Sequence, residues 1–169
     1  TVANRMSEGE TMTIKNLRDF IELCEAEGEL KRVKKEVDWD LELSHISKLN
    51  EEKGGPALLF ENVKGSIGSV LIGAFTSPKR LAIALGMPRH YSIADMAREW
   101  TRLTSEKLIP PKEVKSGPIM ENIIEGGEVD LTKFPAPRFY PLDGGRFIGT
   151  ATFRVERDPE TGAINLGVS

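Results

Sequence analysis

The sequence predicts an α+β fold, in which an N-terminal mixed α/β domain is followed by the first strands of an antiparallel β unit. Up to Leu103, amphipathic helical patterns alternate with short apolar runs. The adjacent Pro110 and Pro111 then interrupt any helix. Beyond them, turn signals and alternating strands replace the helical periodicity. We therefore predict domains at residues 13–110 and 111–169, preceded at 1–12 by a polar leader or tag remnant.

Composition excludes several classes of protein. The 169 residues, 39% hydrophobic and 29% charged, are typical of a globular chain, and the net charge of -3 provides no basic excess for binding nucleic acid. The single cysteine, Cys24, cannot form an internal disulfide. No apolar run approaches the roughly 20 residues that span a bilayer. The sequence thus predicts a cytoplasmic protein that has neither membrane nor nucleic acid as a partner.

The first helix is expected between Asn16, a capping residue type, and Gly28, a terminating one. Cys24 falls on its apolar face and is therefore expected to be a core residue rather than a nucleophile. In residues 30–37, the apolar positions 33 and 37 lie among lysines and an arginine, a pattern that favours an exposed strand whose basic side chains face solvent.

Asp40 is placed to cap a second helix, which ends at the Gly-Gly-Pro sequence of residues 54–56. The apolar runs 57–63 and 69–75 are short, contain β-branched residues and are flanked by glycine. They predict two buried or half-buried strands.

Two further helices have clear start signals. Ser77 followed by Pro78 predicts a helix that ends before Gly86. Ser92 predicts another, which runs through Leu103.

The chemically most informative segment is residues 144–169, which predicts two strands joined by the Asp-Pro-Glu-Thr-Gly turn at 158–162. Asn165 on the second strand either satisfies a hydrogen bond near the turn, as asparagine commonly does, or offers a hard oxygen to Mg²⁺ or Mn²⁺. Gly167 lies on the same face by strand periodicity, where it leaves room for a ligand or marks a bulge.

Other candidates favour structural roles. His45 and His90 are the only histidines, and neither has a partner at metal-ligand spacing. The chain also lacks a P-loop and a Gly-x-Ser-x-Gly nucleophile motif.

Several segments, in their order and spacing, resemble the N-terminal part of a UbiD-family decarboxylase from about Thr13 to Ser169. The most specific is Gly-Pro-Ala-Leu-Leu-Phe-Glu-Asn-Val-Lys-Gly at residues 55–65. The others are Asn-Leu-Arg-Asp-Phe-Ile at 16–21, Gly-Glu-Leu at 28–30, Pro-Ala-Pro at 135–137, Asp-Gly-Gly-Arg-Phe at 143–147, and the 158–162 turn leading into Asn-Leu-Gly at 165–167.

The resemblance implies that residues 111–169 begin an antiparallel FMN-binding split β-barrel. It assigns a metal ligand to Asn165 and cofactor contacts to Thr150, Asn165, Gly167, Val168 and Ser169. Many relatives carry serine at the position of Gly167, so only a backbone contact carries over there. The family's catalytic arginine would be residue 170, and its other metal ligands and proton-transfer glutamates also lie beyond Ser169, so we expect no catalytic residue within this chain.

The resemblance further implies a carboxy-lyase that acts reversibly on aromatic, heteroaromatic or α,β-unsaturated acids. Prenylated FMN, Mn²⁺ or Mg²⁺, and additionally K⁺, are the implied cofactors, and the flavin supplies the electron sink that decarboxylation requires. The implied partners are the acid substrate, the remainder of the same polypeptide and further copies in a homo-oligomer, and the 169-residue fragment alone is expected to be inactive. The alternatives are a flavin-binding split-barrel module without decarboxylase chemistry, and a structural subunit.

Overall fold

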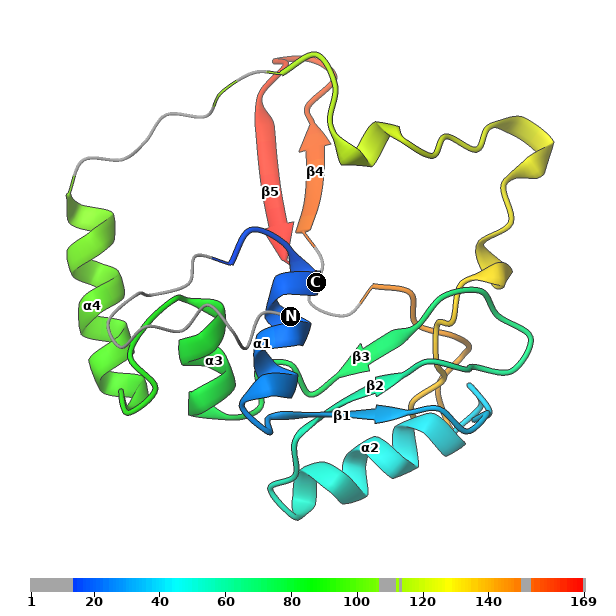
Figure 1. Ribbon diagram of the computed structural model, residues 1–169. Coiled ribbons are helices and arrows are strands. Elements are labelled where there is room, and N and C mark those ends of the chain that lie inside the picture. The colour runs from blue at the N-terminus through cyan, green and yellow to red at the C-terminus, as the bar shows by residue number, and fades with distance from the viewer. Residues whose placement is uncertain (1–13, 107–111, 113, 150–152, 169) are drawn as a thin grey trace.

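The structure is a computed structural model that describes residues 14–106, 112, 114–149 and 153–168. Figure 1 shows its helices and strands, which follow in the order α1 (Leu17–Ala26), β1 (Leu30–Val33), α2 (Glu42–Glu52), β2 (Ala57–Phe60), β3 (Val70–Ile72), α3 (Pro78–Ala84), α4 (Ile93–Ser105), β4 (Phe153–Arg157) and β5 (Ile164–Val168). Short 3-10 turns lie at Pro118–Met120, Gly126–Glu128 and Leu131–Lys133. The predicted α+β class is confirmed.

The N-terminal domain is a three-layer sandwich around β2. This strand lies between β1, which is parallel to it, and β3, which is antiparallel. All four residues of β2 are buried, and they alternate between two apolar clusters. One cluster joins the sheet to α1 and α3 through Phe20, Leu23, Cys24, Leu30, Ala57, Leu59 and Ile83. The other joins it to α2 through Val37, Leu43, Leu58, Phe60 and Val63.

Three predicted helix starts are confirmed. The Asn16 side chain accepts hydrogen bonds from the first turn of α1, and Ser77 accepts one from the backbone N–H of Arg80 in α3. Ser92 and Asp95 form a reciprocal capping box at the start of α4. Gly86 follows α3 with a φ of 64°, a left-handed conformation that favours glycine.

The start of α2 differs from the prediction that Asp40 caps it. Leu41 is the capping residue, with a φ of 68° and no side-chain hydrogen bond to the helix. The Glu42 carboxylate instead accepts a hydrogen bond from the backbone N–H of Asp38, at 2.7 Å. Asp40 is free to form an ion pair with Arg138, at 2.9 Å, because its side chain is not needed at the helix end.

The strands are shorter than predicted. The expected strand over 30–37 ends at Val33, and Val37 adds only an isolated bridge to Val63. The runs 57–63 and 69–75 likewise contribute only Ala57–Phe60 and Val70–Ile72. Apolar content marked the position of each strand, whereas the length of the hydrogen-bonded ladder depends on where the neighbouring strand turns away.

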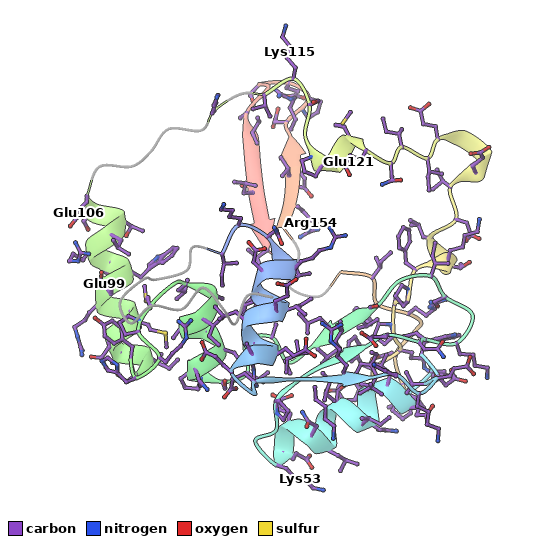
Figure 2. The ribbon with its side chains drawn as sticks, viewed as in Figure 1. Lys53, Glu99, Glu106, Lys115, Glu121 and Arg154 are labelled. Carbon is purple, nitrogen blue, oxygen red and sulfur yellow. The ribbon has the colours of Figure 1, made fainter. Side chains whose placement is uncertain are left out.

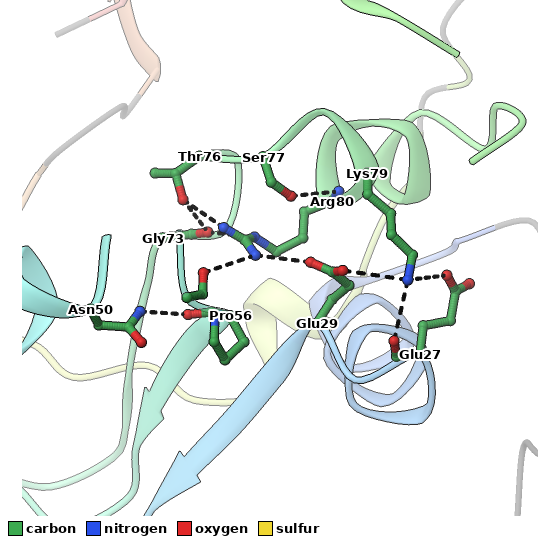
Figure 3. A network of polar contacts seen from close by, with 10 residues as sticks. Glu27, Glu29, Asn50, Pro56, Gly73, Thr76, Ser77, Lys79 and Arg80 are labelled. Carbon is green, nitrogen blue, oxygen red and sulfur yellow. Dashed lines mark hydrogen bonds and ion pairs between the residues drawn. The ribbon is translucent and has the colours of Figure 1, made fainter. Parts of the chain in front are cut away.

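A buried arginine joins α3 to the sheet (Figure 3). Arg80 is 3% exposed and donates to the Glu29 carboxylate at 3.0 Å and to the Gly73 carbonyl at 2.9 Å. Its second terminal nitrogen donates to Thr76 at 2.7 Å. Lys79 also lies 3.4 Å from Glu29, but it is considerably more exposed. This hydrogen-bonded pairing satisfies a charge that would otherwise be costly to bury.

Cys24 is fully buried in the first apolar cluster, as expected of a core residue. Burial raises the pKa of its thiol to about 11. The thiolate form that a nucleophile needs is therefore scarce at neutral pH.

Residues 131–148, which we call the strap, return from the second predicted domain to the N-terminal one. The Ile67 N–H donates to the Lys133 carbonyl at 2.8 Å, and the Arg138 N–H donates to the Trp39 carbonyl at 3.0 Å. Beyond the strap, β4 and β5 form a separate sheet of two strands among the residues that the structure describes, and this sheet projects away from the three-layer domain (Figure 1). The predicted leader at 1–12 and the domain boundary at 110/111 lie outside the described residues.

Candidate functional site

The hairpin of β4 and β5 has two chemically different faces. Glu156 lies opposite Asn165, and Arg154 lies opposite Gly167. Facing residues on paired strands share one side of the sheet, and alternate residues return to that side, so these four share a polar face. The other face carries the apolar side chains of Val155, Ile164, Leu166 and Val168, which are all at least 60% exposed.

The polar face is open above Gly167. Arg154, labelled in Figure 2, has a terminal nitrogen 3.9 Å from the position that a Cβ on Gly167 would take, which is the nearest approach by a described residue other than the chain neighbours of Gly167. The guanidinium also lies 3.9 Å from the Glu156 carboxylate. The backbone at Gly167 is thus accessible to a ligand, beside one cationic and one anionic side chain.

The oxygen donors of this face suit a divalent cation. Asn165 supplies a neutral amide oxygen, and the Glu156 carboxylate faces it across the hairpin. Hard cations such as Mg²⁺ prefer oxygen ligands of this kind and require about six of them. Over the described ranges, no group of three or more His, Cys, Asp or Glu side chains is arranged to hold a metal. The hairpin therefore fits one part of a cation site.

The turn that joins the strands is ordered by Asp158. Its carboxylate accepts hydrogen bonds from the backbone N–H groups of Thr161, at 2.7 Å, and Glu160, at 2.8 Å. These donors hold the pKa of Asp158 below its usual range. Gly162 closes the turn with a φ of 72°. The predicted 158–162 turn is confirmed, and it sets the register that places Asn165 opposite Glu156.

The structure brings together only some of the predicted site residues. Asn165 and Gly167 lie on the polar face, whereas the Val168 side chain points to the apolar face, so that only its backbone could contact a ligand beside them. Thr150 and Ser169 lie outside the described residues. The predicted metal role of Asn165 and the cofactor contacts stay predictions.

The sequence patterns predict no role for Arg138 and Arg146, the two arginines that anchor the strap to the N-terminal domain. Arg146 places its guanidinium carbon 4.4 Å from the centre of the Trp39 ring, and Arg138 pairs with Asp40. The sequence marks Arg146 only through the Asp-Gly-Gly-Arg-Phe motif at 143–147, which carries part of the family resemblance. A contact with residue 39 leaves no periodic pattern in the sequence.

Two open grooves flank the strap. One, of about 530 Å³, is apolar and is lined mainly by β3 and strap residues such as Phe134, Pro137 and Phe147. The other, of about 520 Å³, lies between α2 and the strap and includes His45 and Tyr140.

In the part of the chain that the structure describes, neither histidine belongs to a group of three or more His, Cys, Asp or Glu side chains that could hold a metal, and the structural roles of both stay predictions. His45 is exposed on α2. The rings of His90 and Tyr91 pack edge to face, with their centroids 5.3 Å apart.

Two family models match most of the chain. Residues 21–100 match the 3-octaprenyl-4-hydroxybenzoate carboxy-lyase N-terminal domain, and residues 112–169 match the Rift-related domain of the same carboxy-lyase.

No helix among the described residues has the length and apolar character required to cross a membrane.

Individual relatives agree with the family models. The chain is 33% identical to pyrrole-2-carboxylic acid decarboxylase of Pseudomonas aeruginosa, over 86% of this chain and 31% of that protein. It superposes on vanillic acid decarboxylase of Sedimentibacter hydroxybenzoicus with a TM-score of 0.82 and 32% identity, covering 93% of this chain and 36% of that one.

A third match is the UbiD-class enzyme HmfF of Pelotomaculum thermopropionicum, solved as an evolved dimeric form in complex with prFMN. Its TM-score is 0.75 at 31% identity, covering 90% of this chain and 34% of that one. The chain spans about a third of the length of the relatives that it matches.

Proposed function

Because the chain belongs to the UbiD family of carboxy-lyases, we propose that it forms the N-terminal portion of an enzyme that reversibly decarboxylates aromatic, heteroaromatic or α,β-unsaturated carboxylic acids. The observation that carries this proposal is the match of residues 112–169 to the family's Rift-related domain, within which the hairpin presents Asn165 and Gly167 on one open face. Two relatives are named as decarboxylases of aromatic or heteroaromatic acids, which supports this substrate class.

The proposed cofactor is prenylated FMN, held with Mn²⁺ or Mg²⁺ and an additional K⁺. The prFMN complex of a 31% identical relative supports the flavin. Bound there, the modified flavin would accept the charge that is left when CO₂ departs. Asn165 would supply one oxygen to the divalent cation that grips the flavin phosphate, and Gly167 would allow the backbone to approach the ring.

Thr150, Val168 and Ser169 complete the proposed cofactor contacts of this chain. They follow from the family pattern, and for Val168 the contact is through the backbone. Residues 111–169 would form the first strands of a split β-barrel, so we propose that later polypeptide supplies the catalytic arginine, the remaining metal ligands and the proton-transfer groups.

We also propose a cytoplasmic enzyme that acts as a homo-oligomer. The dimeric form described for HmfF supports self-association. Without the remaining polypeptide, the 169-residue chain should be catalytically inactive.

The test uses the complete polypeptide with prFMN and Mn²⁺. We expect CO₂ release from vanillic acid, pyrrole-2-carboxylic acid or another acid of this class, and loss of metal and flavin in Asn165→Ala. Asn62→Ala is the matched control, because Asn62 is an exposed asparagine of the N-terminal domain, remote from the hairpin in the sequence.

Retention of metal, flavin and full activity in Asn165→Ala would contradict the role of the residue. If the complete polypeptide binds unmodified FMN reversibly and releases no CO₂ from any acid of the class, a flavin-binding module is the better account. If the complete polypeptide binds neither prenylated nor unmodified FMN, a structural subunit is the better account.

A further inference from the structure

Arg146 gathers three backbone carbonyls of the strap around one side chain. Its Nε donates to the Ala136 carbonyl at 2.8 Å, and its terminal nitrogens donate to the carbonyls of Thr132, at 3.0 Å, and Phe134, at 2.6 Å. In addition, the Phe147 N–H donates to the Pro137 carbonyl at 2.9 Å. These hydrogen bonds join the end of the strap, at Arg146 and Phe147, to its beginning, so that the strap forms a closed loop.

The same guanidinium fixes this loop to the N-terminal domain. It lies over the Trp39 ring, 4.4 Å from the ring centre, in a cation–π contact. Trp39 also accepts the backbone N–H of Arg138 at 3.0 Å. A single residue of the N-terminal domain thus holds the strap through both its ring and its carbonyl.

The backbone next to Trp39 is strained. Leu41 has a φ of 68°, the left-handed region that leucine rarely adopts. Its N–H donates to the Arg138 carbonyl at 3.3 Å, and its carbonyl accepts from the Ser44 hydroxyl at 2.8 Å. The Ser44 hydroxyl also lies 3.0 Å from the Phe139 carbonyl of the strap. The strained turn is therefore one of the places where the strap is hydrogen-bonded to the N-terminal domain.

We propose that Arg146 is a positioning residue, which clamps the strap on Trp39 and so influences where the β4–β5 hairpin, which follows the strap in the chain, lies relative to the N-terminal domain. That the positioned hairpin carries cofactor contacts rests on the proposed function, whereas the clamp itself rests on the contacts above. Only arginine suits this role, because its planar fork reaches several carbonyls while its face stacks on an aromatic ring.

The clamp is tested by the distance between two spin labels in this chain, which needs no cofactor. The labels are placed at Glu22→Cys on α1 and Glu160→Cys in the hairpin turn, both exposed positions, in a Cys24→Ala background. We expect Arg146→Gln to broaden the distance distribution about twofold, because the strap that precedes the hairpin loses its contact with Trp39. Arg157→Gln is the matched control, since among the described residues the Arg157 guanidinium donates to the Gly162 carbonyl, within the hairpin itself.

Two further variants separate positioning from stability. Trp39→Leu removes the aromatic platform but leaves the carbonyl bonds of Arg146, and we expect it to broaden the distribution as well. Arg146→Lys keeps a charge over Trp39 but loses the fork, so it should restore only part of the narrow distribution. An unchanged distribution in folded Arg146→Gln and Trp39→Leu would overturn the clamp.

The link to the site is tested in the complete enzyme by Mn²⁺ titration. Substituting a residue that orients a metal ligand typically lowers metal affinity about tenfold or more. We therefore expect the Mn²⁺ affinity to fall by about that factor in Arg146→Gln and to stay unchanged in Arg157→Gln. A broadened label distance with unchanged Mn²⁺ affinity would overturn the link to the site. Failure of the proposed function itself would show as the absence of Mn²⁺ and flavin binding in the unsubstituted enzyme.

Discussion

The three-layer N-terminal domain and the C-terminal hairpin bury their apolar residues to very different extents. In the domain, Phe60 and Leu43 are fully buried between sheet and helices. In the hairpin, Val155, Leu166 and Val168 are between 66% and 68% exposed, although they are equally apolar. Two-stranded hairpins are marginally stable alone and need further strands or a covering element. The difference indicates that the first region is held by its own contacts, whereas the apolar face of the second is suited to burial against more protein.

Core truncation should separate the two regions most strongly. Phe60→Ala removes a fully buried ring from the central strand, and we expect it to lower the free energy of unfolding by about 3–5 kcal/mol. Leu166→Ala, at an exposed hairpin position, should change it by less than about 0.5 kcal/mol. Urea unfolding of the 169-residue chain, followed by far-ultraviolet circular dichroism, measures both. Equal losses would show that the hairpin belongs to the same cooperative core.

The buried ion pair gives the next largest effect. Arg80→Met removes the buried donor of the Thr76 hydroxyl and of the Glu29 carboxylate, so we expect a loss of about 2–3 kcal/mol. Lys79→Met alters the neighbouring, more exposed contact with Glu29 and should cost less than about 1 kcal/mol. Thermal unfolding of both variants tests whether burial, rather than charge alone, sets the contribution of each pair.

The capping box of α4 should contribute less to the free energy of unfolding than the buried Arg80 does. Ser92→Ala removes the hydroxyl that accepts the Asp95 N–H, and we expect a loss of about 1 kcal/mol. Thr101→Ala, in the middle of the same helix, serves as the control and should be nearly neutral, because its hydroxyl bonds only within the helix. If the two variants unfold at the same urea concentration, the cap is not contributing to the stability of the domain.

The hairpin turn should show the smallest and most local effect. Its hydrogen bonds hold the pKa of Asp158 below the ordinary carboxyl value, so they stabilise the turn at neutral pH. This contribution is present above the unfolded pKa and is lost as pH falls through the depressed folded value. We expect the Thr161 amide resonance to shift in that acidic range in the native chain but not in Asp158→Ala. A shift centred above the ordinary carboxyl range would contradict the assignment.

Local patterns predicted most of the fold because caps and apolar runs act within a few residues. Asn16, Ser77 and Ser92 start their helices as expected, since a capping side chain bonds to backbone only two or three residues away. The prediction that Asp40 caps α2 was wrong because the side chain has a distant partner. Its carboxylate pairs with Arg138, a partner far along the chain, and the strained Leu41 takes the position of the cap.

The candidate site was predictable only where the family pattern marked it. Asn165 and Gly167 share a face because strand residues alternate, which the sequence indicated. The position of Glu156 opposite Asn165 depends on hairpin register, which the Asp158 turn sets. The contact of Arg146 with Trp39 joins two domains, and no local pattern encodes it.

We propose that the polar face of the hairpin is part of a metal and flavin site that later polypeptide completes. The most direct measurement is the anomalous scattering of Mn²⁺ in crystals of the complete polypeptide grown with prFMN. Our account predicts a single strong peak at direct coordination distance from Asn165 Oδ1, with the flavin phosphate and later residues as the other ligands. A bound flavin whose metal peak lies away from Asn165 would contradict it.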